Sequence, residues 1–452
     1  MNYRPFSNQL TSLAAPILLA STILSGCIVT VQAHDSAGSN KGTTAGQLTL
    51  NAAVAVALEQ NPAIKTARAK WQSARERITQ AAAWDDPKLS FNSLLGRFVS
   101  ISPNGFTDQA LTVEQMIPVS GKNRSKERIA TAEAIASFED FRRQQLEIIS
   151  KTKASYFRLA NFYSLLDLND QEEATLAQTL NATKAKLEVG TQSQADYLIT
   201  QVERQKIAEA RRDLQEKLSN EQSELKVLMN QDPFSPLGRP ILSGDLTYDL
   251  SADRLRRLAL ANRPEIRQAQ SMVIETAEKI QLAKRAWIPD PSVSLQAEHY
   301  NAGSQAISEI NAGISIDLPW FNGKKYRAGE REAQSDYLAA QEALEGAQAE
   351  TLGLLREQLQ KLETRHHHIE LYREQLLPTA RQTVSSYQAD YETNKATLIQ
   401  VLTAENNLRD LETMYNQDLT DYRVALVDLE PLVGTELSAG NIRSQSANRS
   451  SK

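Results

Sequence analysis

The sequence predicts a mainly α-helical fold with a small β component, made of two tandem repeats that each contain long coiled-coil helices and two β-strands. Three observations lead to this prediction. Four landmarks recur in the same order about 202 residues apart, four short segments alternate apolar and polar residues, and residues 119–232 contain no proline. Aromatic residues make up only 6% of the chain, which is typical of proteins that bury apolar seams rather than one thick core.

The start of the chain predicts export. Residues 10–33 carry no charged side chain, which is typical of a secretory signal sequence. Cys27 is the only cysteine and follows Leu24-Ser25-Gly26; this tetrapeptide resembles the bacterial lipobox, so we expect lipidation at Cys27. The alternatives are ordinary cleavage after Ala33, which discards Cys27, and retention of the apolar run as one spanning helix.

The repeats organise the rest of the chain. The recurring landmarks are Asn61-Pro62 and Arg263-Pro264, Trp84 to Pro87 and Trp287 to Pro291, Pro118 to Lys122 and Pro319 to Lys324, and finally Gly190 and Asn394. A tandem duplication explains their common order. The predicted divisions are a signal sequence at 1–33, a polar linker at 34–47, a first repeat at 48–245, a second repeat at 246–434 and a disordered polar tail at 435–452.

Each repeat opens with a predicted helix, at about Leu50–Ala83 in the first and Asp253–Ala286 in the second. Two segments with period-two alternation follow in each repeat. They cover residues 87–91, 111–114, 292–298 and 310–317. Such alternation predicts strands that are apolar on one face and polar on the other.

Long helices follow the strands. A helix from Gly121 to Glu188 would be about 100 Å long, and Gly190 then permits a reversal into a returning helix. The second repeat shows a coiled-coil seam with alternating steps of three and four residues. The seam residues are Leu352, Leu355, Leu359, Leu362, His366 and Ile369. Pro378 should kink or bend the second long helix.

Four strands per chain cannot close a barrel, because the smallest barrels need about eight strands. The apolar face of these strands must therefore be covered by other subunits or by lipid. Three copies would supply twelve strands, and the helices, which are too polar for lipid, would continue the ring as a tunnel in the periplasm.

The order of helix, two strands, long helix and returning helix, present twice, resembles the TolC family of outer-membrane efflux proteins over nearly the whole mature chain. The Asn-Pro after the first helical turns, the Asp-Pro before a strand and the Pro-x-x-Gly-Lys at the start of the long helix are similar too. The resemblance implies a homotrimer in the outer membrane, with a 12-stranded β-barrel embedded in lipid and an α-helical barrel in the periplasm. It further implies a passive exit duct, not an enzyme and without cofactors, that docks on a periplasmic adaptor and an inner-membrane pump.

The same resemblance places a gate where the long and returning helices reverse. The gate residues that it implies are Gly190, Asp196, Tyr391 and Asn394. Ala396 and Thr403 stand where some members have an arginine and a second aspartate, so another closing contact, or a weaker one, is expected. Asp196 is also placed to cap the returning helix, and the sequence leaves capping alone or capping with gating open.

Other chemistry is disfavoured. His366, His367 and His368 point about 100° apart on a helix, so we interpret them as solvated or inter-helix residues rather than metal ligands. No catalytic constellation or phosphate-binding loop appears in the sequence. The net charge of −5 gives no reason to expect a nucleic-acid partner.

Two questions stay open at this level. A structural or adhesive coiled-coil protein of the cell envelope is the alternative function, although a spacer has no need of four alternating strands. The cargo of a duct could be metal cations, drugs or protein. The Pro-x-x-Gly-Lys entry is slightly more similar to the metal-efflux branch of the family, and an acidic ring of Asp196 would suit cations.

Overall fold

The computed structural model describes residues 47–94, 107–242, 251–300, 305–393 and 395–437, all within one compact unit. The predicted signal sequence with Cys27, the predicted gate residue Asn394 and most of the predicted polar tail lie outside the described residues. Among the residues that are described, no helix is both long enough and apolar enough to cross a bilayer.

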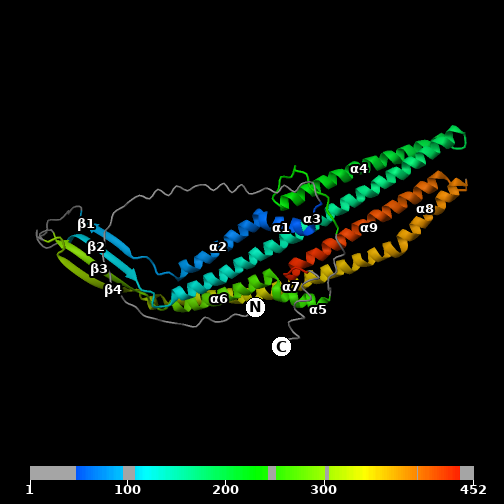
Figure 1. Cartoon of the computed structure of the whole chain (residues 1–452). Helices are drawn as coiled ribbons and strands as arrows, with labels where there is room; N and C mark the ends of the chain where they lie inside the picture. The colour runs from blue at the N-terminus through cyan, green and yellow to red at the C-terminus, as the bar shows by residue number, and fades with distance from the viewer. Residues whose placement is uncertain (1–46, 95–106, 243–250, 301–304, 394, 438–452) are drawn as a thin grey trace, which may run out of the picture. The chain divides into compact units, whose positions relative to one another are not determined.

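The described elements follow the duplicated order that the sequence predicts (Figure 1). The first repeat contains α1 (Leu50–Gln60), α2 (Pro62–Ala82), β1 (Lys88–Ser93), β2 (Thr107–Met116), α3 (Lys122–Glu188) and α4 (Gln194–Leu228). The second contains α5 (Ala252–Asn262), α6 (Pro264–Arg285), β3 (Pro291–Tyr300), β4 (Glu309–Ile316), a 3₁₀ turn (Pro319–Asn322), α7 (Gly323–Leu371), a π turn (Tyr372–Leu376), α8 (Leu377–Glu392) and α9 (Leu398–Val433).

The four strands form one antiparallel sheet in the order β1-β2-β3-β4, so the two hairpins of the repeats are joined by pairing of β2 with β3. The alternation that predicted them separates the sheet into two faces. One face gathers exposed apolar side chains, namely Leu89, Phe91, Leu111, Val113, Val293, Leu295, Ile310, Ile314 and Ile316. Within a single chain this face has no covering layer of apolar side chains among the described residues.

The prediction of one continuous opening helix per repeat is wrong. Each opening helix is two helices, and the break falls at Asn61-Pro62 in the first repeat and at Arg263-Pro264 in the second. Proline disfavours the helical conformation of the residue before it, and here it becomes the first residue of the next helix. Asn61 stabilises its break, since its side-chain oxygen accepts a hydrogen bond from Ala63 N at 2.9 Å and its amide donates to Leu228 O at 2.8 Å.

The long helix of the first repeat is confirmed: α3 has 67 residues, which corresponds to about 100 Å. It packs against α2, α4, α6 and α9, and Figure 1 shows α4 returning beside it. The long helix of the second repeat consists of α7, the π turn and α8. The π turn ends one residue before Leu377-Pro378, so the irregularity expected from Pro378 is present and lies just upstream of it, where Figure 1 shows the chain bending.

The predicted seam of α7 is half right. Leu355, Leu362 and Ile369 are buried, but the line of burial continues through Thr351 and Gln358. His366 is exposed, with 59% of its side chain accessible, so its assignment to the apolar seam is wrong. The physical reason is that α9 packs against α7 along the line of Leu355 and Leu362. His366 is one residue away from this line of buried positions and therefore faces solvent.

Each repeat has its own apolar core. The first joins α1, α2, α3 and the end of α4 with Val427 of α9, and includes the fully buried Ala53, Ala57, Leu159 and Leu225. The second joins α5, α7 and α9. Leu255 and Ala259 in α5 occupy the positions that correspond to Ala53 and Ala57 in the repeat, so the duplication extends to the packing of the opening helices.

Candidate functional site at the helical hairpin tips

The reversal between α3 and α4 is built by local backbone chemistry. Gly190 has a φ of +76°, a conformation that glycine adopts without the steric cost a Cβ brings. Its N–H donates to Leu187 O at 2.9 Å, and Thr191 N donates to Lys186 O at 2.9 Å, which together satisfy the last carbonyls of α3. The predicted reversal at Gly190 is confirmed.

Asp196 is not the N-cap of the returning helix, so the capping role that both interpretations of the sequence gave it is wrong. The N-cap of α4 is Ser193, whose side-chain oxygen accepts a hydrogen bond from Asp196 N at 3.2 Å. Asp196 lies in the first turn, where its carboxylate accepts from Ser193 Oγ at 2.8 Å. Serine three residues before the aspartate takes the cap because its short hydroxyl reaches the free N–H groups directly.

Gln192 connects the two hairpins of the chain, and sequence reasoning missed it. Its Nε2 donates to Asp196 Oδ2 at 2.7 Å, and its Oε1 accepts from the hydroxyl of Tyr391 at 3.3 Å. Lys186 Nζ lies 4.0 Å from the centre of the Tyr391 ring. Gly190, Asp196 and Tyr391 are therefore brought together at one tip, through Gln192. Burial raises the pKa of Tyr391 and the charge of Asp196 raises it further, so the phenol stays protonated and able to donate.

The second reversal, between α8 and α9, has the same plan with different side chains. Thr397 caps α9 and forms a reciprocal capping box with Gln400. By the repeat spacing Gln400 corresponds to Asp196, so at this position each chain carries one tip carboxylate rather than two. Ala396 offers only a backbone N–H, donated to Asp390 O at 3.2 Å, and the hydroxyl of Thr403 donates to Ile399 O in its own helix at 2.7 Å.

Behind the tip, an apolar cluster holds the two hairpins against each other. Leu398 and Leu402 of α9 pack with Leu176 of α3 and Ile207 of α4, and all four are buried. Tyr391 packs against the same cluster. The polar contacts of Gln192 thus lie at the tip, where the apolar seam between the two repeats ends.

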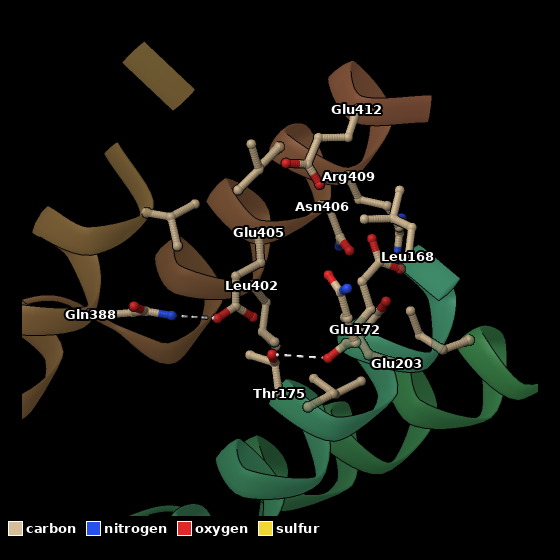
Figure 2. A pocket seen from close by; sticks show the side chains of 15 residues that line it. Leu168, Glu172, Thr175, Glu203, Gln388, Leu402, Glu405, Asn406, Arg409 and Glu412 are labelled. Atoms are coloured by element: carbon tan, nitrogen blue, oxygen red, sulfur yellow. Dashed lines mark hydrogen bonds between the residues drawn. The ribbon is translucent and has the colours of Figure 1, made fainter. Parts of the chain in front are cut away.

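A cavity of about 280 Å³ lies next to this cluster, between α3, α4, α8 and α9 (Figure 2). Its apolar wall is formed by Leu168, Leu176, Ile207, Val384, Leu402 and Leu408. Its charged residues are Glu172, Glu203, Glu405, Arg409 and Glu412. Figure 2 shows Glu172 and Glu405 on opposite sides of the space, with Gln388 donating to Glu405 at 2.9 Å.

The cavity holds carboxyl groups that resist ionisation. Burial raises the pKa of Glu172 to about 7; Arg409 lowers it, and the charges of Glu412, Asp410 and Glu405 raise it again. One carboxyl oxygen of Glu172 is buried without a hydrogen-bond partner among the described residues. Burial also raises the pKa of Glu405, against the hydrogen bond from Gln388. The sequence did not reveal this group, because it depends on which faces of four helices meet.

Replacing Glu172 by Gln should therefore change the pH dependence of stability. The raised pKa of Glu172 means that it contributes stability below pH 4.5 and that this contribution is lost as the pH rises through about 7. The variant E172Q should gain about 1 kcal/mol over the native chain at pH 8, since a half-exposed carboxylate is partly screened, and almost nothing at pH 4. Thermal midpoints at the two pH values measure this.

The control is E357Q, which replaces an exposed glutamate of α7 that pairs with Lys361. It should shift stability by less than about 0.5 kcal/mol at either pH. Equal responses of E172Q and E357Q at pH 8 would refute the burial of the Glu172 charge.

Within the described part of the chain, no three His, Cys, Asp or Glu side chains are placed to hold a metal ion. His366 lies 3.2 Å from Glu370 on the surface of α7, and His368 lies 3.5 Å from Asp418 of α9. These are separate two-residue contacts, with His366 also against the ring of Tyr422.

A family model described as outer membrane efflux protein matches residues 53–230 and 255–435, one segment in each repeat. The chain belongs to the outer membrane efflux protein family. Outer membrane efflux proteins are channels rather than enzymes, so this chain is the outer-membrane channel component of a tripartite efflux system, with its helical tunnel in the periplasm. Channels of this family act as homotrimers with a periplasmic adaptor and an inner-membrane pump.

Individual members of the outer membrane efflux protein family agree with this assignment. The chain is 22% identical over 401 residues to the outer membrane protein TolC of Escherichia coli, which covers 83% of this chain and 80% of TolC. It is 25% identical to the toluene efflux pump outer membrane protein TtgF of Pseudomonas putida over 51% of this chain and 48% of that protein. The structure of VceC from Vibrio cholerae has the same fold, with a TM-score of 0.72 at 19% identity over 86% of this chain and 97% of VceC.

Proposed function

We propose that three copies of this chain form a closed exit duct. In this proposal the tips of the duct close through Tyr391, Gln192 and Asp196. The duct passes cationic solutes, with heavy-metal cations as one class. The observation that carries the proposal is the sheet. Its apolar face is exposed in the single chain, and the strands at its two ends, β1 and β4, each pair with only one neighbour among the described residues.

The sheet needs both lipid and sister subunits. Leu89 is 69% exposed, Phe91 64% and Ile314 73%, and burying such a face in lipid is favourable at about 25 cal/mol per Å². Open strand edges in hydrocarbon cost several kcal/mol for each unpaired backbone group, so the edges must pair. Four strands from each of three chains give twelve, enough for a closed barrel.

We infer that the closing contact that the sequence left open lies at the tip. The salt bridge of some relatives is not available, because Ala396 stands at the position of its arginine and Thr403 at the position of its second aspartate. In their place, the hydroxyl of Tyr391 donates to Gln192 across the two hairpins, and Gln192 holds Asp196. We take this neutral contact, with the apolar cluster behind it, to be what holds the second hairpin inward in the closed duct.

Negative charge supports the cation proposal. Three copies of Asp196 would make an acidic ring at the tip, and rings of carboxylates favour cations in channels. Glu203 and Glu412 add carboxyl groups further from the tip, in the cavity that also contains Arg409. The name of TtgF refers to toluene. The test must therefore distinguish a cationic cargo from an apolar cargo.

Planar-bilayer recording of the purified protein tests the duct and its selectivity together. We expect discrete channels whose reversal potential in a salt gradient favours cations, and a smaller cation preference for D196N. Absence of conductance would contradict the duct, and an unselective conductance would contradict the cation proposal alone. In cells, deletion of the gene should raise sensitivity to copper, zinc, cobalt or cadmium; increased sensitivity to toluene alone would remove the metal cargo.

A further inference from the structure

The cavity between the two hairpins has room for a small organic molecule. Its volume is about 280 Å³, whereas an apolar cavity of about 150 Å³ is already enough to bind benzene. Its walls come from α3, α4, α8 and α9, so a molecule inside it contacts both repeats of the chain (Figure 2).

One part of the wall suits a hydrocarbon group better than water. The six leucine, isoleucine and valine side chains of the wall are contributed by all four helices. They offer no hydrogen-bond partner, whereas an ordered water needs several. Removing apolar surface from water is favourable, so an apolar group of a ligand gains by packing on this part of the wall.

Glu172 is the charged residue of the cavity that lacks a partner. Its Oε1 atom is buried without a hydrogen-bond partner among the described residues, and Arg409 lowers its pKa without forming an ion pair with it. An N–H donor of a ligand would satisfy this oxygen. The other four charged side chains are already engaged, in the pairs Glu203–Lys206, Glu405–Gln388, Glu412–Arg381 and Arg409–Asp410.

We propose that this cavity binds an amphiphilic organic monocation, which has an apolar body and one ammonium group, and that the bound cation holds the tip closed. The ammonium donates a hydrogen bond to Glu172 Oε1, and the apolar body packs on the six aliphatic side chains. The binding site stands on the geometry of one chain, whereas the effect on closure rests on the proposed duct.

Two other classes of ligand fit the cavity less well. A metal ion held by the protein needs at least three ligand groups, and the described residues contain no group of three His, Cys, Asp or Glu placed for this. An anion would find Arg409 as the only cationic side chain among the residues that line the cavity, beside four glutamates. The charge of the wall therefore favours a cation, and its apolar part favours a cation with a hydrocarbon body.

The position of the cavity links binding to closure. Leu176, Ile207 and Leu402 belong both to its wall and to the apolar cluster behind the tip. The wall is complete only while α8 and α9 lie against α3 and α4, so the ligand makes more contacts in this arrangement than with the hairpins apart. A ligand shifts a conformational equilibrium by its difference in affinity between the two states, so the bound cation favours the closed tip.

Calorimetric titration of the full-length protein with 4-phenylbutylamine at pH 8 tests the site. We expect saturable binding, and affinities at least about ten-fold lower for 4-phenylbutanol, which lacks the charge, and for butylamine, which lacks the ring. E172Q should bind the amine about ten-fold more weakly, and E357Q should bind it as the native chain does. Partition into detergent is the same for every variant, so equal affinities of E172Q and the native chain would overturn the site.

The pH dependence of binding identifies the carboxyl group. The affinity of the native chain for 4-phenylbutylamine should rise about ten-fold from pH 6 to pH 8, because the amine stays protonated while Glu172, with a pKa of about 7, becomes ionised. Arg409 and the other acidic groups around Glu172 remain in E172Q, namely Glu203, Glu405, Asp410 and Glu412. A rise of the same size in E172Q would assign the ligand to those groups and overturn the role of Glu172.

Bilayer recording tests the effect on closure separately. In Y391F, which lacks the contact between the hairpins, the amine at ten times its dissociation constant should lower the ratio of open to closed channels at least about ten-fold. The double variant Y391F/E172Q should respond far less; an equal response would show block of the pore and overturn the closing role. Binding without any change in open probability also overturns that role alone, whereas absence of conductance in every variant overturns the duct and leaves the calorimetric result to decide the site.

Discussion

Replacing Gly434 by Ala should destabilise the protein by about 2–5 kcal/mol. Gly434 ends α9 with a φ of +72°, a left-handed conformation that costs a residue with a Cβ about 1–2 kcal/mol. A Cβ there would also lie 2.6 Å from the backbone nitrogen of Arg263, and closer to the carbonyl of Asn262. Because these are backbone atoms at the proline break between α5 and α6, they cannot move aside as a side chain would, and overpacking adds about 1–3 kcal/mol.

Gly190 provides the control for this prediction. Its φ is +76°, but no atom lies within 4 Å of the position that a Cβ would take. G190A should therefore lose only the conformational cost of about 1–2 kcal/mol, and G190N less, because asparagine tolerates this conformation and the second repeat has Asn394 at the corresponding position. G434N should remain strongly destabilised. Thermal midpoints by circular dichroism measure all four variants, and equal losses for G434A and G190A would contradict the backbone clash.

Replacing Tyr391 by Phe should open the duct. The variant loses the hydrogen bond to Gln192 while the ring keeps its place beside Lys186 and the apolar cluster. One neutral hydrogen bond contributes about 1 kcal/mol, so three symmetric tips that open together lose about 3 kcal/mol, and the ratio of open to closed channels rises about a hundred-fold. Single-channel recording measures the open probability.

Tyr387 gives the matched control, because it lies one turn earlier on α8 and has no hydrogen-bond partner among the described residues. Y387F should leave the open probability unchanged. Q192A, which removes both contacts of the glutamine, should open the channel at least as far as Y391F. If Y391F and Y387F behave alike, the closing contact lies elsewhere at the tip.

Strand positions and the length of α3 could be predicted because each depends on local pattern. Alternation located all four strands, and a proline-free run bounded by Gly121 and Gly190 located α3. The helix breaks were missed although their signal was present. The helical periodicity of apolar residues continues on both sides of Pro62 and Pro264, so the pattern alone predicts one helix. Only the restriction that proline places on the preceding residue reveals the break.

The residues of the tip could be predicted only where they depend on the reversal between a long helix and its returning helix. Gly190, Asp196 and Tyr391 could be named from the resemblance, and the structure brings them together. Gln192 joins them through a contact between hairpins separated by about 200 residues, and the carboxyl groups around Glu172 meet where four helices pack. No periodicity within one helix records which neighbouring helix it faces, and His366 was misplaced for the same reason.

The most direct test of the trimeric duct is the mass of the purified complex. Native mass spectrometry of the detergent-solubilised protein should show three copies of the mature chain, since four strands with one apolar face and two open edges are satisfied only in a closed ring. A stable monomer that remains folded without detergent would contradict it.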